Sequence, residues 1–179
     1  MDFHIVSLLN HRGHGTRLDT FSQIFSLRLV MIALRIIVVF FATRVKKTIW
    51  KRIVLSFIIA AGLSYLVTDI GFKTLLTEEM GARTRPYIAH STEIFPIGKS
   101  YTDASFPSSH MTFSLAMLTV LIIFFPALWP YAIVYALLMA RSRMHNGMHY
   151  PSDVLAGALI GIGCGWLAIR TSKKIGKIA

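Results

Sequence analysis

The chain has 179 residues, of which 54% are hydrophobic and only 15% are charged, and its mean hydropathy is positive at +0.59. This composition excludes an ordinary soluble domain and indicates an integral membrane protein. The net charge of +11 would suit nucleic acid, but the basic residues cluster between apolar segments, which argues against a nucleic-acid partner. The single cysteine, Cys164, excludes an intrachain disulfide.

The chain begins with a predicted interfacial arm, residues 1–23, in which an apolar stretch, FHIVSLL, precedes a polar turn, HRGHGTRLD. Five apolar segments follow, at approximately residues 24–42, 53–72, 111–125, 131–140 and 154–169. A membrane-spanning helix needs about 20 apolar residues, and the fourth segment is short. The pattern predicts an all-α fold, a polytopic membrane helical bundle of about five to six transmembrane helices, forming a single domain over residues 1–179.

The distribution of basic residues predicts the orientation of this bundle. One basic cluster lies between the first two apolar segments and another in the C-terminal tail: Arg44, Lys46, Lys47, Lys51 and Arg52, and then Arg170, Lys173, Lys174 and Lys177. Positively charged loops stay in the cytoplasm, so both clusters are expected inside. Five spans then place the N-terminus and the long connection, residues 76–107, on the outer or periplasmic face of the plasma (inner) membrane.

Three polar motifs interrupt the apolar pattern. GARTRP follows the second apolar segment, FPSSH precedes the third, and SRMHNGMHYPSD joins the fourth to the fifth. The predicted topology puts all three on the outer face. Polar groups without a common function would be divided between the two faces, so we expect one functional site there.

FPSSH has the composition of an anion-binding helix start. Pro107 suits the first turn of a helix, and Ser108 and Ser109 add hydroxyl groups beside the free backbone N–H groups of that turn. Such a terminus binds anions, phosphate in particular, although an ordinary serine-capped helix start is the alternative. His110 comes next, where it could protonate an oxygen of the bound anion.

SRMHNGMHYPSD contains a candidate nucleophile. The spacing of four between His149 and Asp153 lets the carboxylate reach one imidazole nitrogen, which fixes the tautomer and leaves the other nitrogen free to attack. Alternatively, Asp153 only supplies negative charge at a helix N-terminus. A metal site is a third interpretation, since His145, His149 and Asp153 recur every four residues, but Gly147 and Pro151 interrupt any helix that would align them.

Arginines accompany these motifs. Arg83, Arg85 and Arg143 all lie at membrane ends on the predicted outer face, where snorkelling to water would explain any single one. The convergence of two or three of them on a serine-capped helix start favours a phosphate ligand, because the guanidinium fork matches phosphate oxygens.

The order of these residues resembles the type 2 phosphatidic acid phosphatase superfamily. The resemblance rests on Arg85-Pro86, on Pro107-Ser108 with His110, and on Ser142-Arg143 followed by His149 and Asp153. Within that superfamily the short, membranous chain is most similar to bacterial lipid phosphatases, such as undecaprenyl diphosphate phosphatases and lipid A 1-phosphatases. The resemblance implies a metal-independent hydrolase without a cofactor. Its substrate would be a phosphorylated membrane lipid: a prenyl diphosphate, lipid A or a glycerophospholipid.

The resemblance also implies a role for each site residue. His149 would be the nucleophile that forms a phosphohistidine, Asp153 its orienting partner, and His110 the acid for the leaving oxygen. The phosphate would be held by Arg85, Arg143, Ser108 and the backbone at Ser109. The family usually places a lysine seven positions before the arginine of the RP pair, where this chain has Glu78. We expect Lys73 and Arg83 to contact phosphate instead, with Glu78 and Glu79 pointing to water.

A transporter or channel is the alternative class of protein. It would account for charged residues inside apolar segments, such as Arg28 and Asp69, which we expect to pair near the outer face. It gives no reason for two histidines and a serine-capped turn on the same face, so the phosphatase interpretation is favoured.

Overall fold

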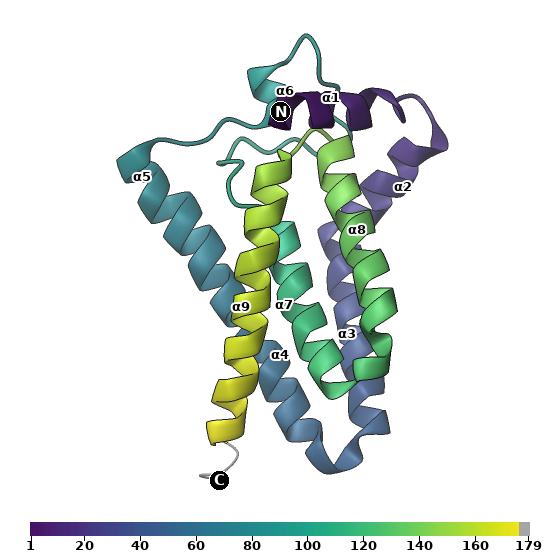
Figure 1. Ribbon diagram of the computed structural model, residues 1–179, viewed down its shortest axis with the longest axis vertical. Helices are drawn as coiled ribbons and strands as arrows, with labels where there is room; N and C mark the ends of the chain where they lie inside the picture. Colours follow the sequence, from purple (N-terminus) through teal and green to yellow (C-terminus); the bar gives the residue numbers. More distant parts are fainter. Residues whose placement is uncertain (176–179) are drawn as a thin grey trace.

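The computed structural model describes residues 1–175; residues 176–179, and with them Lys177, lie outside the described part, as do the side chains of Arg28 and Met80. Residues 1–175 form a bundle of helices and contain no β-strand (Figure 1). The all-α fold class predicted from the sequence is confirmed.

The helices run alternately from one end of the bundle to the other. In order they are α1 (Asp2–His11), α2 (Arg17–Ser26), α3 (Arg28–Val45), η1 (Lys47–Ile49), α4 (Trp50–Tyr65), η2 (Leu66–Leu76), α5 (Thr77–Met80), α6 (Pro86–Ala89), α7 (Ser109–Phe124), η3 (Pro126–Leu128), α8 (Trp129–His145) and α9 (Pro151–Ile175). In Figure 1 the hairpin of α3 and α4 is closed at the bottom, and its two arms diverge towards the top.

Two long apolar helical stretches, 47–79 and 151–175, could each cross a membrane by length and composition. A third stretch qualifies if α2 and α3 are taken as one bent span, and α7 is apolar but has only 16 residues. The count of five to six spans therefore remains a prediction. The first helix of the bundle starts later than expected, because the chain bends at Leu27. The fourth continues beyond Ala140 to His145, because its polar last turn packs against the N-terminal arm.

The α-helix α4 continues directly into a π-helix. Residues 66–76 form a π-helix, η2, which carries Asp69 and Lys73. π-Helical turns are rare and occur frequently at functional sites. The helix stops at Gly81, whose positive φ of 83° is a conformation that suits glycine. Glu78 and Glu79 on the last turn are exposed, as the sequence predicted.

The centre of the bundle is the close contact between α7 and α9. Three glycines on α9 face the α7 backbone: a Cβ at Gly157, Gly161 or Gly165 would lie 2.7, 2.4 or 2.6 Å from the carbonyl oxygens of Ser108, Thr112 and Ala116. This approach places the first turn of α9, with Asp153, beside the first turn of α7, where Ser108 N–H donates to the Asp153 carbonyl. Helix packing thus brings two of the polar motifs together.

Replacing Gly161 by alanine should destabilise the bundle by about 1–3 kcal/mol, because the new Cβ would force α7 and α9 apart. The matched control is Gly163→Ala on the same helix, where a Cβ meets nothing within 4 Å. This control should keep or raise the unfolding temperature in detergent, since alanine favours the helix. Equal unfolding temperatures for the two variants would contradict the close packing.

The N-terminal arm lies across the end of the bundle that carries the polar motifs (Figure 1). Asn10 joins α1 to two other segments: its Nδ2 donates to the carbonyls of Phe95 (2.9 Å) and His145 (2.7 Å), and its Oδ1 accepts from Phe95 N–H. The loop between α3 and α4, which carries the first basic cluster, lies at the opposite end together with the C-terminal end of α9. The polar motifs and the basic clusters therefore occupy opposite ends of the molecule.

Candidate functional site

A cavity of about 300 Å³ opens among α3, α4, η2, α7 and α8, with the loop before α7 along its rim. Its wall includes six of the nine residues predicted as site residues from the sequence: Lys73, Arg85, Ser109, His110, Arg143 and His149. Ser108, Asp153 and Arg83 are not part of the wall. The cavity is cationic, since among the described residues four basic side chains face two carboxylates, those of Asp69 and Asp103.

His149 lines this cavity with one ring nitrogen protonated and the other unprotonated. Its Nδ1 lies 2.8 Å from the carbonyl oxygen of Ser105, and a carbonyl only accepts, so Nδ1 carries the proton. The unprotonated Nε2 lies 3.4 Å from Nη1 of Arg85. Burial, followed by the charges of Arg143 and Arg85, holds the pKa of His149 well below its usual range. The imidazole is therefore neutral at neutral pH and can act as a nucleophile.

Asp153 acts on His149 less directly than the spacing of four suggested. Its Oδ2 lies 3.8 Å from His149 Nδ1, which is too long for a hydrogen bond. That oxygen already accepts from the Ser105 hydroxyl and from Tyr150 N–H at 2.8 Å. Because Ser105 also supplies the carbonyl that holds Nδ1, Asp153 positions the imidazole through Ser105.

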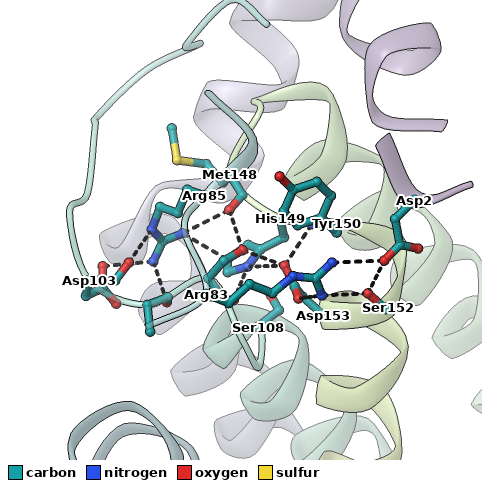
Figure 2. A network of polar contacts seen from close by, with 12 residues as sticks. Asp2, Arg83, Arg85, Asp103, Ser108, Met148, His149, Tyr150, Ser152 and Asp153 are labelled. Carbon is teal, nitrogen blue, oxygen red and sulfur yellow. Dashed lines mark hydrogen bonds and ion pairs between the residues drawn. The ribbon is translucent and has the colours of Figure 1, made fainter. Parts of the chain in front are cut away.

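Arg85 and Lys73 converge on one carboxylate. Asp103 accepts from Lys73 Nζ at 2.7 Å and from Arg85 Nη2 at 2.8 Å, and Arg85 Nη1 also donates to the Met148 carbonyl (Figure 2). Burial alone would raise the pKa of Asp103, but the hydrogen bonds and charges of Lys73 and Arg85 outweigh it and lower the pKa. Lys73 thus reaches the cavity wall from the π-helix.

Arg143 is a buried cation that has no partner among residues 1–175 as far as their side chains are described. Its side chain is 3% exposed and lines the cavity, and within the described residues it makes no hydrogen bond or ion pair, with Nε buried and unbonded. A buried charge is costly unless it is paired. The free guanidinium is therefore suited to an anionic ligand inside the cavity.

The first turn of α7 completes the wall. Ser109 Oγ donates to Asp69 Oδ1 at 3.0 Å, while Ser108 is fully buried and its Oγ makes no hydrogen bond among the described residues. Asp69 also accepts from Thr68 at 3.0 Å. The expected pairing of Asp69 with Arg28 stays a prediction, because the side chain of Arg28 lies outside the described part of the chain.

Arg83 lies elsewhere than predicted. Its guanidinium donates to Asp153 Oδ1 (2.6 Å), Ser152 Oγ (2.7 Å) and Asp2 Oδ2 (3.0 Å), and it covers the ring of Tyr150 at 4.2 Å. In Figure 2, Arg83 and Arg85 lie on either side of His149. The structure gives Arg83 no place on the cavity wall, because Asp153 and the N-terminal residue Asp2 bind it on the far side.

His145 does not join a metal site. Its Nδ1 lies 2.8 Å from the Leu9 carbonyl and its Nε2 lies 2.9 Å from Asp19 Oδ1, so the N-terminal arm occupies both nitrogens. The helix α8 ends at His145, and the loop through Gly147 turns His149 to a different direction. Among residues 1–175, no three side chains of ligand type come together to hold a metal ion.

Sequence reasoning missed three site residues. Ser105 and Asp103 lie in an irregular loop, where no periodicity signals which side chains turn inwards. Arg35 lies inside an apolar helix, α3, and lines the cavity. The signal that could have found it is its position seven residues from the start of that helix, too deep for an ordinary helix-end arginine.

These features define a helical protein with a cationic cavity and a buried neutral histidine. The sequence model of the PAP2 superfamily matches residues 28–177, which covers most of the chain. The chain belongs to the PAP2 superfamily, so the resemblance to type 2 phosphatidic acid phosphatases is confirmed.

Several known proteins are similar to this chain. It is 32% identical over 111 residues to the undecaprenyl-diphosphatase BcrC of Bacillus subtilis, covering 62% of this chain and 51% of that protein. It is also 32% identical over 115 residues to a lipid A 1-phosphatase of Rhizobium etli, covering 61% and 48%. The chain thus spans about half the length of these curated relatives.

Two solved structures share the arrangement of helices. The crystal structure of Aquifex aeolicus LpxE superposes with a TM-score of 0.68 at 25% identity, covering 94% of both chains. A PAP2-type phosphatidylglycerolphosphate phosphatase from Bacillus subtilis superposes with a TM-score of 0.55 at 20% identity, covering 97% of this chain and 94% of that one. The second likeness shows the fold alone.

Proposed function

We propose that this protein is a membrane lipid phosphatase that releases a phosphoryl group from a lipid headgroup through a phosphohistidine at His149. One observation carries the proposal: the unprotonated Nε2 of His149 shares a cavity with the buried guanidinium of Arg143, which has no partner among the described residues. A phosphate would supply the missing counter-charge and present its phosphorus to the imidazole. The relatives named above act, by their names, on undecaprenyl diphosphate and lipid A, which fits a phosphorylated lipid as the substrate.

Binding of the phosphate follows from the charges on the cavity wall. Arg143, Arg85 and Lys73 neutralise the phosphoryl oxygens, and the free N–H groups of the first turn of α7, at Ser109, add donors. Asp103 occupies Lys73 and Arg85 in the free protein and gives way to the phosphate, whose oxygens suit the same two cations. Such positioning and charge neutralisation supply most of the catalysis of phosphoryl transfer.

The reaction proceeds in two steps. The Nε2 of His149 attacks phosphorus, the bond to the leaving oxygen breaks, and His110 gives that oxygen a proton. Ser105, held by Asp153, keeps the proton on Nδ1 and stabilises the charge that develops on the ring. Water then attacks the phosphohistidine, His110 takes its proton, and breakage of the N–P bond releases inorganic phosphate and restores His149. Arg83 positions Asp153 rather than the phosphate.

Lipid access and orientation complete the proposal. The helices α3, the α4–η2 stretch, α7, α8 and α9 cross the membrane, the basic clusters stay inside, and the site opens at the outer face beneath the interfacial arm. Ile32 of α3 and Tyr65 of α4 line the cavity and are 42% and 53% exposed, which suits a lipid that slides in between α3 and α4. A transporter is not favoured, because the relatives are phosphatases.

Accessibility to a membrane-impermeant thiol reagent tests the orientation. A cysteine at the exposed loop position Glu93 should react from outside intact spheroplasts, whereas one at the exposed position Lys173 should react only after lysis. The native Cys164 is buried and supplies the background. The reverse pattern would put the site on the cytoplasmic face.

Phosphate release from lipids in detergent tests the function itself. Purified protein should release inorganic phosphate from at least one of a prenyl diphosphate, lipid A and phosphatidate, and EDTA should not inhibit it. Vanadate should inhibit, because it imitates five-coordinate phosphorus bound to histidine. Activity lost in EDTA and restored by a divalent metal would contradict the histidine mechanism and revive the metal interpretation.

A further inference from the structure

Arg35 is a charged residue that the proposed reaction does not use. It lies on α3, seven residues after the start at Arg28, which is about 10 Å along the helix. Its side chain lines the same cavity as His149 and Arg143. An arginine at such depth in a membrane helix is costly and generally has a partner or a function.

The N–H donors of Arg35 have no acceptor in the described part of the chain. Within the described residues the guanidinium forms no ion pair or hydrogen bond, and its Nη2 is buried without a partner. The group stacks on the ring of Phe113, with Cζ 5.5 Å from the ring centroid. Stacking engages the flat face of the guanidinium and leaves the N–H donors at its edge free for an anion.

Arg35 lies at the deep end of the cavity. Phe113, on which it stacks, is one helical turn further along α7 than Ser109 and His110. Met31 and Ile32 lie about one turn before Arg35 on α3, Tyr65 ends α4, and these three lining residues are apolar or aromatic. The polar end, with His149 and Arg143, suits the phosphoryl group under attack. The apolar end suits the lipid, so the leaving group of any lipid substrate passes beside Arg35.

We infer that Arg35 binds a second phosphoryl group, the one attached to the leaving oxygen, so that the site selects a lipid diphosphate over a lipid monophosphate. The inference rests on the proposed phosphatase function. His149 attacks the terminal phosphorus, and the bond from that phosphorus to the bridging oxygen breaks. The bridging oxygen keeps the electron pair and departs as part of a lipid monophosphate, whose added negative charge Arg35 neutralises. Water then releases the terminal group as inorganic phosphate.

Variants of two arginines on α3 test the inference. Wild type, Arg35→Met, Arg35→Lys and Arg44→Met should be compared on a prenyl diphosphate and a prenyl monophosphate of equal chain length. Arg44 is the matched control, since it also stacks on a phenylalanine, Phe40, at 4.8 Å, but lies near the other end of the helix.

Arg35→Met should lower the ratio of kcat/KM for diphosphate to that for monophosphate about 10- to 100-fold, the usual effect of losing a charged hydrogen bond. Arg35→Lys should lower this ratio less than Arg35→Met does, because lysine keeps the positive charge. Arg44→Met should leave the ratio at the wild-type value. An equal loss on both lipids in Arg35→Met, or no loss on either, would overturn the inference.

The wild-type protein gives a second test that does not depend on the folding of a variant. It should show the higher kcat/KM on the diphosphate. Equal values or a preference for the monophosphate would overturn the role of Arg35 while leaving the phosphatase function intact. Release of phosphate from neither lipid, nor from any other phospholipid, would instead contradict the proposed function.

Discussion

Replacement of His149 by glutamine should reduce phosphate release by about 10⁴-fold or more, the loss expected when a covalent nucleophile is removed. Glutamine is close to histidine in size and its amide N–H₂ can still donate to the Ser105 carbonyl, which now accepts from Nδ1 at 2.8 Å. The variant should therefore keep its fold and its affinity for lipid. Phosphate release and lipid binding are measured on the same detergent preparation.

The control for His149→Gln is His4→Gln, which changes an exposed histidine of α1. It should leave turnover within about twofold of wild type, as expected for a surface substitution. Retention of substantial turnover by His149→Gln would show that water attacks the phosphorus without a covalent step.

Arg143→Met should reduce phosphate release by about 10³-fold, the order expected when an arginine that stabilises the transferring phosphoryl group is lost. The change in unfolding temperature in Arg143→Met shows whether Arg143 serves the reaction or stabilises the fold. Because the guanidinium is buried and unpaired among the described residues, methionine removes an uncompensated charge. The unfolding temperature of the variant should therefore stay equal or rise.

The matched control is Arg141→Met, two residues earlier on α8 and absent from the cavity wall. It should keep turnover near the wild-type level. If Arg143→Met lost activity together with stability, Arg143 would be holding the bundle rather than the phosphate.

Several residues that short motifs singled out lie together in the structure, and their roles in catalysis stay predictions. His110, Arg85, Arg143 and His149 meet in one cavity because each lies at an end of a helix or immediately beside one. Helix ends at the same side of a membrane bundle converge whatever the details of packing. Lys73 also lines the cavity, since a helix that continues to Gly81 carries it there, and its contact with phosphate stays a prediction.

Contacts made through irregular loops could not be predicted. The carbonyl that holds His149 belongs to Ser105, 44 residues earlier, and the carboxylate between Lys73 and Arg85 belongs to Asp103 in the same loop. Arg83 was expected at the phosphate because it is two residues from Arg85. Residues 81–85 have no regular structure, and this irregular path turns Arg83 to the other side of His149, where it meets Asp2. No local pattern connects Arg83 with Asp2.

The sequence predicted the order of the apolar helices along the chain, but it did not predict some of their boundaries. Hydropathy ended the fourth apolar segment at Ala140, because Arg141, Arg143 and His145 are polar. The helix nevertheless runs to His145, since the N-terminal arm and the cavity supply polar surroundings for this turn. Tertiary contacts at the C-terminal end of α8 thus outweighed the low hydropathy of residues 141–145, and this end of the helix carries Arg143.

Trapping of the phosphoenzyme tests the central claim most directly. Wild-type protein is mixed with a lipid carrying a labelled terminal phosphate, quenched in alkali during a single turnover, digested and analysed by mass spectrometry. The account predicts label on the peptide that contains His149, stable in alkali and lost in acid, as an N–P bond requires. Label on a different residue, or full turnover without any labelled peptide, would contradict it.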